Sequence, residues 1–211
     1  MSDHDDFTVE PVEGLPEALP EGERILWQGR PRTRTLAREA LGLNWVLGYF
    51  VVITIWRTAV SSNTMTLTEA MGTAVPFLVL GTVAAAIILL IAWVQSRATV
   101  YTITTDRVAM RIGAALTLTL NMPFKKIASA DLDLRKKGTG TIALTTVGGV
   151  KLSYLILWPH VRPWHMKVTQ PALRCIPDAE RVARLLSEAV ETRVSQPVLS
   201  RGTPSGAVAA E

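Results

Sequence analysis

Two uncharged apolar runs dominate the first half of the chain, over residues 40–56 and 70–96. The first run has seventeen residues, which rise roughly 25 Å as a helix against a bilayer core of about 30 Å, and the second is long enough to cross outright. We therefore expect transmembrane helices at 40–57 and 70–96, joined by a loop of residues 58–69. Two core helices of a soluble protein are the alternative, but the chain has too little polar sequence to cover both.

After Arg97 the pattern changes to the alternation of apolar and polar residues that is typical of β-strands. The alternation predicts strands at 100–104, 107–112, 116–120, 127–135, 141–147, 150–157 and 167–176. Residues 136–140 indicate a turn, and Gly148-Gly149 predicts a tight hairpin between two of these strands. Pro171 places the last strand at a sheet edge or a bulge.

The spacing of apolar residues becomes helical after Pro177 and Asp178, which are typical helix-start residues. Val182, Leu186 and Ala189 fall on one face of the predicted helix. The chain is therefore expected to be an α+β protein: a two-helix transmembrane hairpin, followed over residues 97–192 by a seven-stranded antiparallel barrel or sandwich whose open end this helix caps. The tail at 193–211 is rich in Pro, Gly, Ser and Ala, which predicts disorder.

Charge divides the segment before the first span into two parts. Residues 1–22 are acidic without Lys or Arg and are expected to be mostly disordered, whereas residues 23–39 combine a strand with a basic juxtamembrane stretch. Because the loop at 58–69 has no Lys or Arg, the positive-inside rule predicts that both termini are cytoplasmic and that the loop is periplasmic in a bacterium. A basic patch can also bind nucleic acid, but no aromatic–basic interleaving accompanies it, so we expect no nucleic-acid partner.

Catalytic and cofactor signatures are missing from the sequence. It contains no Ser-His-Asp order, glycine-rich phosphate loop or metal-ligand spacing, and its single Cys175 excludes an internal disulfide. Neither uncharged run contains His, Asp, Glu, Lys or Arg, which argues against a proton-driven transporter or a pigment-carrying antenna subunit. We expect a protein that is not an enzyme and that holds no cofactor or metal.

Three stretches carry a resemblance to a known family: Glu21-Gly-Glu-Arg-Ile-Leu-Trp-Gln-Gly-Arg-Pro31, Tyr101-Thr-Ile-Thr-Thr-Asp-Arg107, and Met122-Pro-Phe-Lys-Lys-Ile-Ala-Ser129 with Gly138-Thr-Gly-Thr-Ile142. With the order of elements, they resemble bacterial pleckstrin-homology-like membrane proteins, over most of residues 10–192. The resemblance implies a PH-like domain to which Arg24-Ile-Leu-Trp-Gln28 can add a strand.

Residues 13–31, and Trp158-Pro-His-Val-Arg-Pro-Trp-His-Met-Lys167 ahead of Pro171-Ala-Leu-Arg-Cys-Ile-Pro-Asp178, are similar to photosynthetic complex assembly proteins within that group. This similarity implies a role in assembling the bacteriochlorophyll reaction centre in the inner, intracytoplasmic photosynthetic membrane, with its subunits as partners. A general PH-like membrane protein that binds lipid headgroups or other membrane proteins is the alternative. Both PH-like barrels and spans with small residues self-associate, so a homo-oligomer is compatible with the sequence.

Two groups of residues are candidate sites. A loop rich in Trp, Arg and His is the candidate partner-binding surface, since Trp and Arg are enriched at interface hot spots; its residues are Trp158, His160, Arg162, Trp164 and His165. Packing of this loop on the barrel or the membrane interface, or ligation of pigment magnesium by a histidine, are the other interpretations. The candidate lipid-headgroup residues, which could also be simply solvated, are Arg30, Arg32, Arg34, Arg38, Arg135, Lys136 and Lys137.

Overall fold

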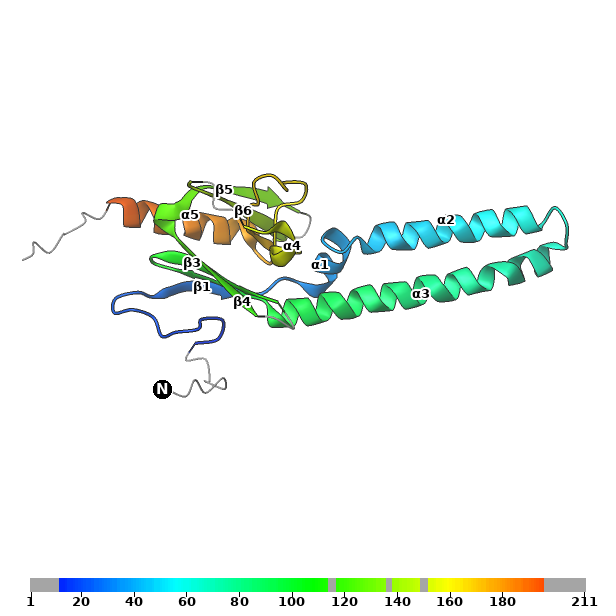
Figure 1. The fold of residues 1–211 in the computed structure, drawn as a ribbon, viewed down its shortest axis with the longest axis horizontal. Helices are drawn as coiled ribbons and strands as arrows, with labels where there is room; N and C mark the ends of the chain where they lie inside the picture. The colour runs from blue at the N-terminus through cyan, green and yellow to red at the C-terminus, as the bar shows by residue number, and fades with distance from the viewer. Residues whose placement is uncertain (1–11, 114–116, 136–137, 149–151, 196–211) are drawn as a thin grey trace, which may run out of the picture.

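The computed structural model describes residues 12–113, 117–135, 138–148 and 152–195. Its shape is a β-domain from one end of which a long helical hairpin projects (Figure 1). This arrangement confirms the α+β class and the hairpin expected from the sequence. The predicted disordered tails lie largely outside the described residues, at 1–11 and 196–211, although Leu15, within the predicted N-terminal tail, is buried at 4% exposure.

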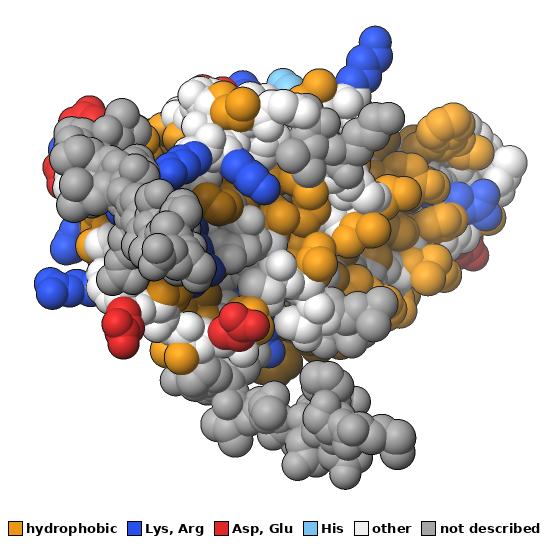
Figure 2. Space-filling model, turned by 60° about the vertical axis from the view of Figure 1, so that its left-hand side comes forward, with side chains coloured by type: hydrophobic (Ala, Val, Ile, Leu, Met, Phe, Trp, Pro, Cys, Tyr) orange, Lys and Arg blue, Asp and Glu red, His pale blue; other side chains and the backbone are white. Residues whose placement is uncertain are grey.

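The hairpin consists of α2 (Leu43–Ser61) and α3 (Leu67–Ala98), two helices long and apolar enough to cross a membrane. Only 6% and 11% of their most apolar windows are buried within the protein, so these are not core helices. Figure 2 shows apolar side chains covering the hairpin, whereas charged side chains are distributed over the β-domain. Such an apolar exterior is stable in lipid and unfavourable in water.

The helix boundaries differ from the predicted spans. A capping box of Thr66 and Glu69 starts α3 earlier than expected, so Pro76 lies in the helix interior rather than near its start, and the connecting loop is only residues 62–66. The two helices pack closely where Gly81 faces Phe50, because a Cβ on Gly81 would lie 2.9 Å from the Phe50 side chain.

A further helix, α1 (Thr33–Glu39), occupies part of the segment predicted as strand and basic stretch. Its Leu36 and Ala37 are fully buried at the base of the hairpin, where Ala37 clusters with Leu43 and Ala92. The apolar pair is too short to produce a recognisable helical period in the sequence, and packing against α3 stabilises the helix instead.

Two antiparallel sheets form the β-domain. One has the order β1-β2-β3-β4, with β1 (Ile25–Gly29), β2 (Val100–Thr104), β3 (Arg107–Ile112) and β4 (Leu118–Pro123). The other has the order β5-β6-β7, with β5 (Ile127–Leu134) after the short 3-10 helix η1 (Phe124–Lys126), then β6 (Gly140–Thr146) and β7 (Ala172–Ile176). The expected contribution of residues 24–28 is confirmed, because β1 pairs with β2.

The described part of the domain contains six strands after the hairpin, and β1 is the seventh. The prediction of a strand at 150–157 is wrong over the residues that the structure describes, since Tyr154–Leu157 forms the short helix α4. The last strand begins at Ala172 rather than Lys167, and a long loop precedes it. One turn of helix buries Leu157 in the core while Leu155 and Ile156 face outward, which alternation along a strand would not produce.

Helix α5 (Ala179–Ser195) closes the space between the sheets. Val182 and Leu186 are 2% exposed and belong to the same core cluster as Ile103 of β2 and Ile142 of β6. The capping helix predicted from the spacing of apolar residues is therefore confirmed.

Candidate functional site

The loop between α4 and β7 is attached to the end of α1 and to the residue that follows α3. Arg174 of β7 donates to the carbonyl oxygens of Pro159 and Glu39, at 3.2 and 3.3 Å, and so joins the loop to the end of α1. His160 contacts Thr99, the residue directly after α3, with 3.1 Å between Nε2 and the hydroxyl oxygen. In Figure 1, α4 and the following loop accordingly lie on the hairpin side of the β-domain.

His160 belongs to a buried polar network at this junction. The Tyr101 hydroxyl oxygen accepts from the Arg174 backbone N–H at 3.3 Å and lies 2.6 Å from His160 Nδ1. Burial raises the pKa of Tyr101 far above its ordinary range, so the hydroxyl keeps its proton and stays uncharged. Which ring nitrogen of His160 carries the imidazole proton sets the direction of both bonds, to Tyr101 and to Thr99.

The electrostatic state of His160 follows from the same surroundings. Burial, with a smaller contribution from the positive charge of Arg174, lowers the pKa of His160 to about 3. The imidazole is therefore neutral at physiological pH, and each ring nitrogen has a hydrogen-bond partner. His160 acts as a structural link between the barrel and the hairpin.

This position corrects part of the sequence prediction. His160 is 1% exposed and cannot contribute to a partner surface, because its ring is enclosed by the domain. His165, five residues later, is exposed and has its Nδ1 2.9 Å from the Pro163 carbonyl oxygen. The two histidines thus lie in different environments, which also argues against a shared ligand.

The exposed members of the predicted surface are Trp158, at 44%, and Trp164, at 87%, together with His165. Arg162 is half-buried, and its Nη1 lies 2.7 Å from Oδ2 of Asp131 on β5. The same nitrogen lies 3.1 Å from the side-chain oxygen of Gln170, in the loop before β7. The assignment of these residues to a partner remains a prediction.

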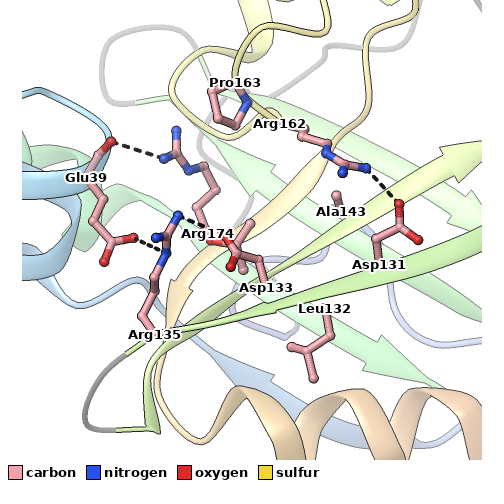
Figure 3. A pocket seen from close by; sticks show the side chains of 10 residues that line it. Glu39, Asp131, Leu132, Asp133, Arg135, Ala143, Arg162, Pro163 and Arg174 are labelled. Atoms are coloured by element: carbon pink, nitrogen blue, oxygen red, sulfur yellow. Dashed lines mark hydrogen bonds and ion pairs between the residues drawn. The ribbon is translucent and has the colours of Figure 1, made fainter.

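Arg162 forms one wall of a charged pocket of about 180 Å³ between β5, β6 and the end of α1 (Figure 3). On the opposite side, Arg135 lies 2.8 Å from Asp133 and 3.7 Å from Glu39. Each of these ion pairs is partly solvated and contributes less than about 1 kcal/mol to stability. They can therefore be exchanged for ion pairs with a partner at low cost.

Sequence reasoning missed this pocket. Asp131 and Asp133 alternate along β5 as residues of a solvent-facing strand do, and nothing local connects them with Arg162, 31 positions away. The only available signal was the spacing of charges on that strand. Within the described ranges, no group of three or more His, Cys, Asp or Glu side chains is arranged to hold a metal ion.

The predicted headgroup residues lie in three places. Arg32, Arg34 and Arg38 are exposed on or beside α1, at the base of the hairpin. Arg30 is ion-paired with Glu13, and Arg135 belongs to the charged pocket. Lys136 and Lys137 lie outside the described residues. Among the described members of this set, Arg32, Arg34 and Arg38 are the ones exposed at the base of the hairpin, and their role at lipid phosphates remains a prediction.

Comparison with known proteins places the fold in a family. The family model described as "Bacterial PH domain" matches residues 43–190, which include both membrane helices and most of the β-domain. This chain belongs to that family. The match begins after β1 and α1, so the segment that fixes the hairpin to the domain lies outside the matched residues.

One curated relative is similar over its whole length. It is the Rhodobacter capsulatus protein named "Uncharacterized 23.7 kDa protein in puhA 5'region", which is 48% identical over 212 residues covering 100% of this chain and 99% of the relative. No solved structure matches this chain.

Proposed function

We propose that this member of the bacterial PH domain family is a non-catalytic assembly factor for the bacteriochlorophyll reaction centre, of the PuhB type. The observation that carries the proposal is the 48% identity, end to end, with a protein whose name places its gene in the puhA 5′ region. That location indicates a photosynthesis-associated role, and the similarity of residues 13–31 and 158–178 to photosynthetic complex assembly proteins narrows it to assembly.

The proposed topology places both termini in the cytoplasm and the hairpin in the inner, intracytoplasmic photosynthetic membrane. Arg32, Arg34 and Arg38 are exposed at the base of the hairpin, and Arg97 lies over the Trp93 ring at 5.8 Å in the last turn of α3. The opposite turn, residues 62–66, has no Lys or Arg. This charge asymmetry supports the orientation.

Docking on nascent reaction-centre subunits is assigned to the charged pocket. The pocket has both signs of charge in partly solvated ion pairs, and it opens beside α1, close to where α2 begins. A juxtamembrane segment of a partner in the same bilayer can reach it, and confinement to the membrane raises the effective concentration of both proteins. Modest contacts at the pocket are then sufficient, and no catalytic group is required.

A deletion strain complemented with variants tests this proposal. Deletion should lower the amount of mature reaction centre, measured by absorption of intact membranes, without lowering subunit transcripts. Arg162→Glu should fail to restore the amount of mature reaction centre. The double variant of Arg162→Glu with Asp131→Arg rebuilds the internal ion pair with reversed charges, and it should fail as well. The matched control is Arg184→Glu on the outer face of α5, where Arg184 is exposed and pairs with Glu180 of the same helix.

The outcomes separate the alternatives. Normal reaction-centre levels in the deletion strain would refute an assembly role and favour a general PH-like protein that binds lipid headgroups. Rescue by the charge-reversed double variant would show that Arg162 and Asp131 serve the stability of the domain rather than docking.

A further inference from the structure

An unusual set of large apolar side chains is exposed on α4 and the loop that follows it. Leu155 is 84% exposed, Ile156 is 66% exposed and Trp164 is 87% exposed. The same stretch also exposes Trp158, Met166 and Val168. Isolated exposed hydrophobic residues are common on proteins, but so many within fourteen consecutive positions mark a surface that is covered in the functional state.

The exposure is not a consequence of a loose segment. Leu157, in the same helical turn, is 2% exposed and belongs to the core of the domain. Directly after α4, Pro159 accepts a hydrogen bond from buried Arg174 and His160 is bonded to Thr99 and Tyr101. Tyr154, the first residue of α4, also packs against the core, so the short helix is held in place with Leu155 and Ile156 directed outward.

The location of this surface identifies what covers it. Thr99 follows the last residue of α3 and Glu39 is the last residue of α1, and both bind the loop region through His160 and Arg174. The apolar surface thus lies on the side of the β-domain from which the hairpin projects, next to the residues that end α1 and follow α3.

We propose that α4 and the loop to Val168 insert into the headgroup–acyl boundary of the leaflet from which the hairpin emerges. Leucine and isoleucine from a short helix, with tryptophans beside them, are the side chains that interfacial segments bury, since tryptophan combines an apolar ring with a polar N–H. Exposed Lys167, in the same loop, and exposed Arg38, in the last turn of α1, supply charges for anionic headgroups. Trp158 and Trp164 are thereby assigned to lipid rather than to a protein partner.

The insertion gives the β-domain a third point of contact with the bilayer, in addition to the two spans. It fixes the tilt of the domain and therefore the height of the charged pocket above the membrane. The inference requires only that the hairpin spans a membrane and is independent of any reaction-centre role.

Site-directed spin labelling of the full chain tests the insertion. The chain is reconstituted in nanodiscs of phosphatidylcholine and phosphatidylglycerol, and nitroxides are attached to Leu155→Cys or Trp164→Cys. Both positions are exposed, so the substitutions do not disturb the core. The native Cys175 is buried and burial raises its pKa to about 12, so it does not react with the label under mild conditions.

Two reference positions calibrate the measurement. Val83→Cys, at 50% exposure in the middle of α3, reports the hydrocarbon, and Ser187→Cys on the exposed face of α5 reports water. We expect labels at 155 and 164 to collide with a water-soluble nickel reagent about fivefold less often than the label at 187, with oxygen accessibility approaching that at 83.

Two results would overturn the proposal. If the labels at 155 and 164 are as accessible to nickel as the label at 187, the surface does not enter the bilayer. If they are accessible in lipid-only nanodiscs but become protected in membranes from photosynthetic cells, a protein covers the surface instead.

Discussion

Replacement of His160 by glutamine should remove most of the pH dependence of domain stability between pH 8 and pH 5. The imidazole is buried between Tyr101 and Thr99 and is neutral in the folded protein. Glutamine has no titratable group but can retain one of the two hydrogen bonds. The variant therefore separates the proton linkage of His160 from its packing.

The size of the effect follows from the two pKa values. The pKa of His160 is lowered to about 3 in the folded protein, against about 6.5 for an unfolded histidine. The folded state therefore binds fewer protons in this interval, so the stability that the neutral imidazole supports is fully present above pH 6.5 and is lost as the pH falls towards 3. At pH 5 the loss amounts to about 2 kcal/mol, since each unit below 6.5 contributes about 1.4 kcal/mol.

Thermal unfolding of the full chain in detergent, followed by near-UV circular dichroism, measures this change. A loss of about 2 kcal/mol lowers the Tm of a domain of this size by roughly 6–12 °C. The wild type should show that decrease between pH 8 and pH 5, whereas His160→Gln should have a lower but nearly constant Tm. His165→Gln is the matched control, because His165 is exposed, and should behave like the wild type. An equal decrease in wild type and His160→Gln would refute the assignment of a buried neutral imidazole.

Three further predictions concern the attachment of β1, the fit of α5 and the single thiol. The side chain of Glu23 is 3% exposed and accepts two hydrogen bonds from Arg107, at 2.8 and 2.9 Å. Glu23→Gln should therefore destabilise the domain by roughly 3 kcal/mol and speed hydrogen exchange in β1, and unchanged exchange would contradict this anchoring role. Gly140→Ala should lower the free energy of unfolding, measured with a chemical denaturant, by roughly 2 kcal/mol, because a Cβ at position 140 would lie 2.7 Å from the Cβ of Ala179. An unchanged denaturation midpoint would show that α5 can shift to make room. Cys175 should react with a maleimide at pH 8 only after unfolding, since burial raises its pKa to about 12; labelling of the native protein would contradict its burial.

The elements with long or regular patterns could be predicted from the sequence. Both apolar helices of the hairpin, the capping helix α5 and the strand at residues 25–29 are present, because each depends on an uncharged run, a repeated apolar spacing or a motif within a few residues. The boundaries were less accurate, since the Thr66–Glu69 capping box extends α3 beyond its uncharged run.

The short helices α1 and α4 could not be predicted, because each is stabilised by contacts with distant residues. Leu36 packs where the hairpin meets the domain, and Leu157 packs in the core, so the surrounding protein selects a helical turn in sequences without a clear period. The burial of His160 is similar. Its partners Thr99 and Tyr101 lie about sixty positions earlier, and only the folded chain reveals that a histidine in a Trp- and Pro-rich segment is internal.

The connection between the hairpin and the β-domain explains how a small anchored protein can present a surface at a fixed position. The hairpin is inserted between two paired neighbouring strands, since β1 precedes α1 and α2 whereas β2 follows α3, with Gly29 opposite Tyr101 at the junction. Thr33 of α1 and Ser96 of α3 are joined by a 2.6 Å hydrogen bond, which closes the same junction from the membrane side. A rotation of the domain relative to the spans would have to break this pairing together with the buried His160 network. The charged pocket and the apolar surface on α4 therefore keep a constant position relative to the hairpin, as the proposed docking on a membrane-embedded partner requires.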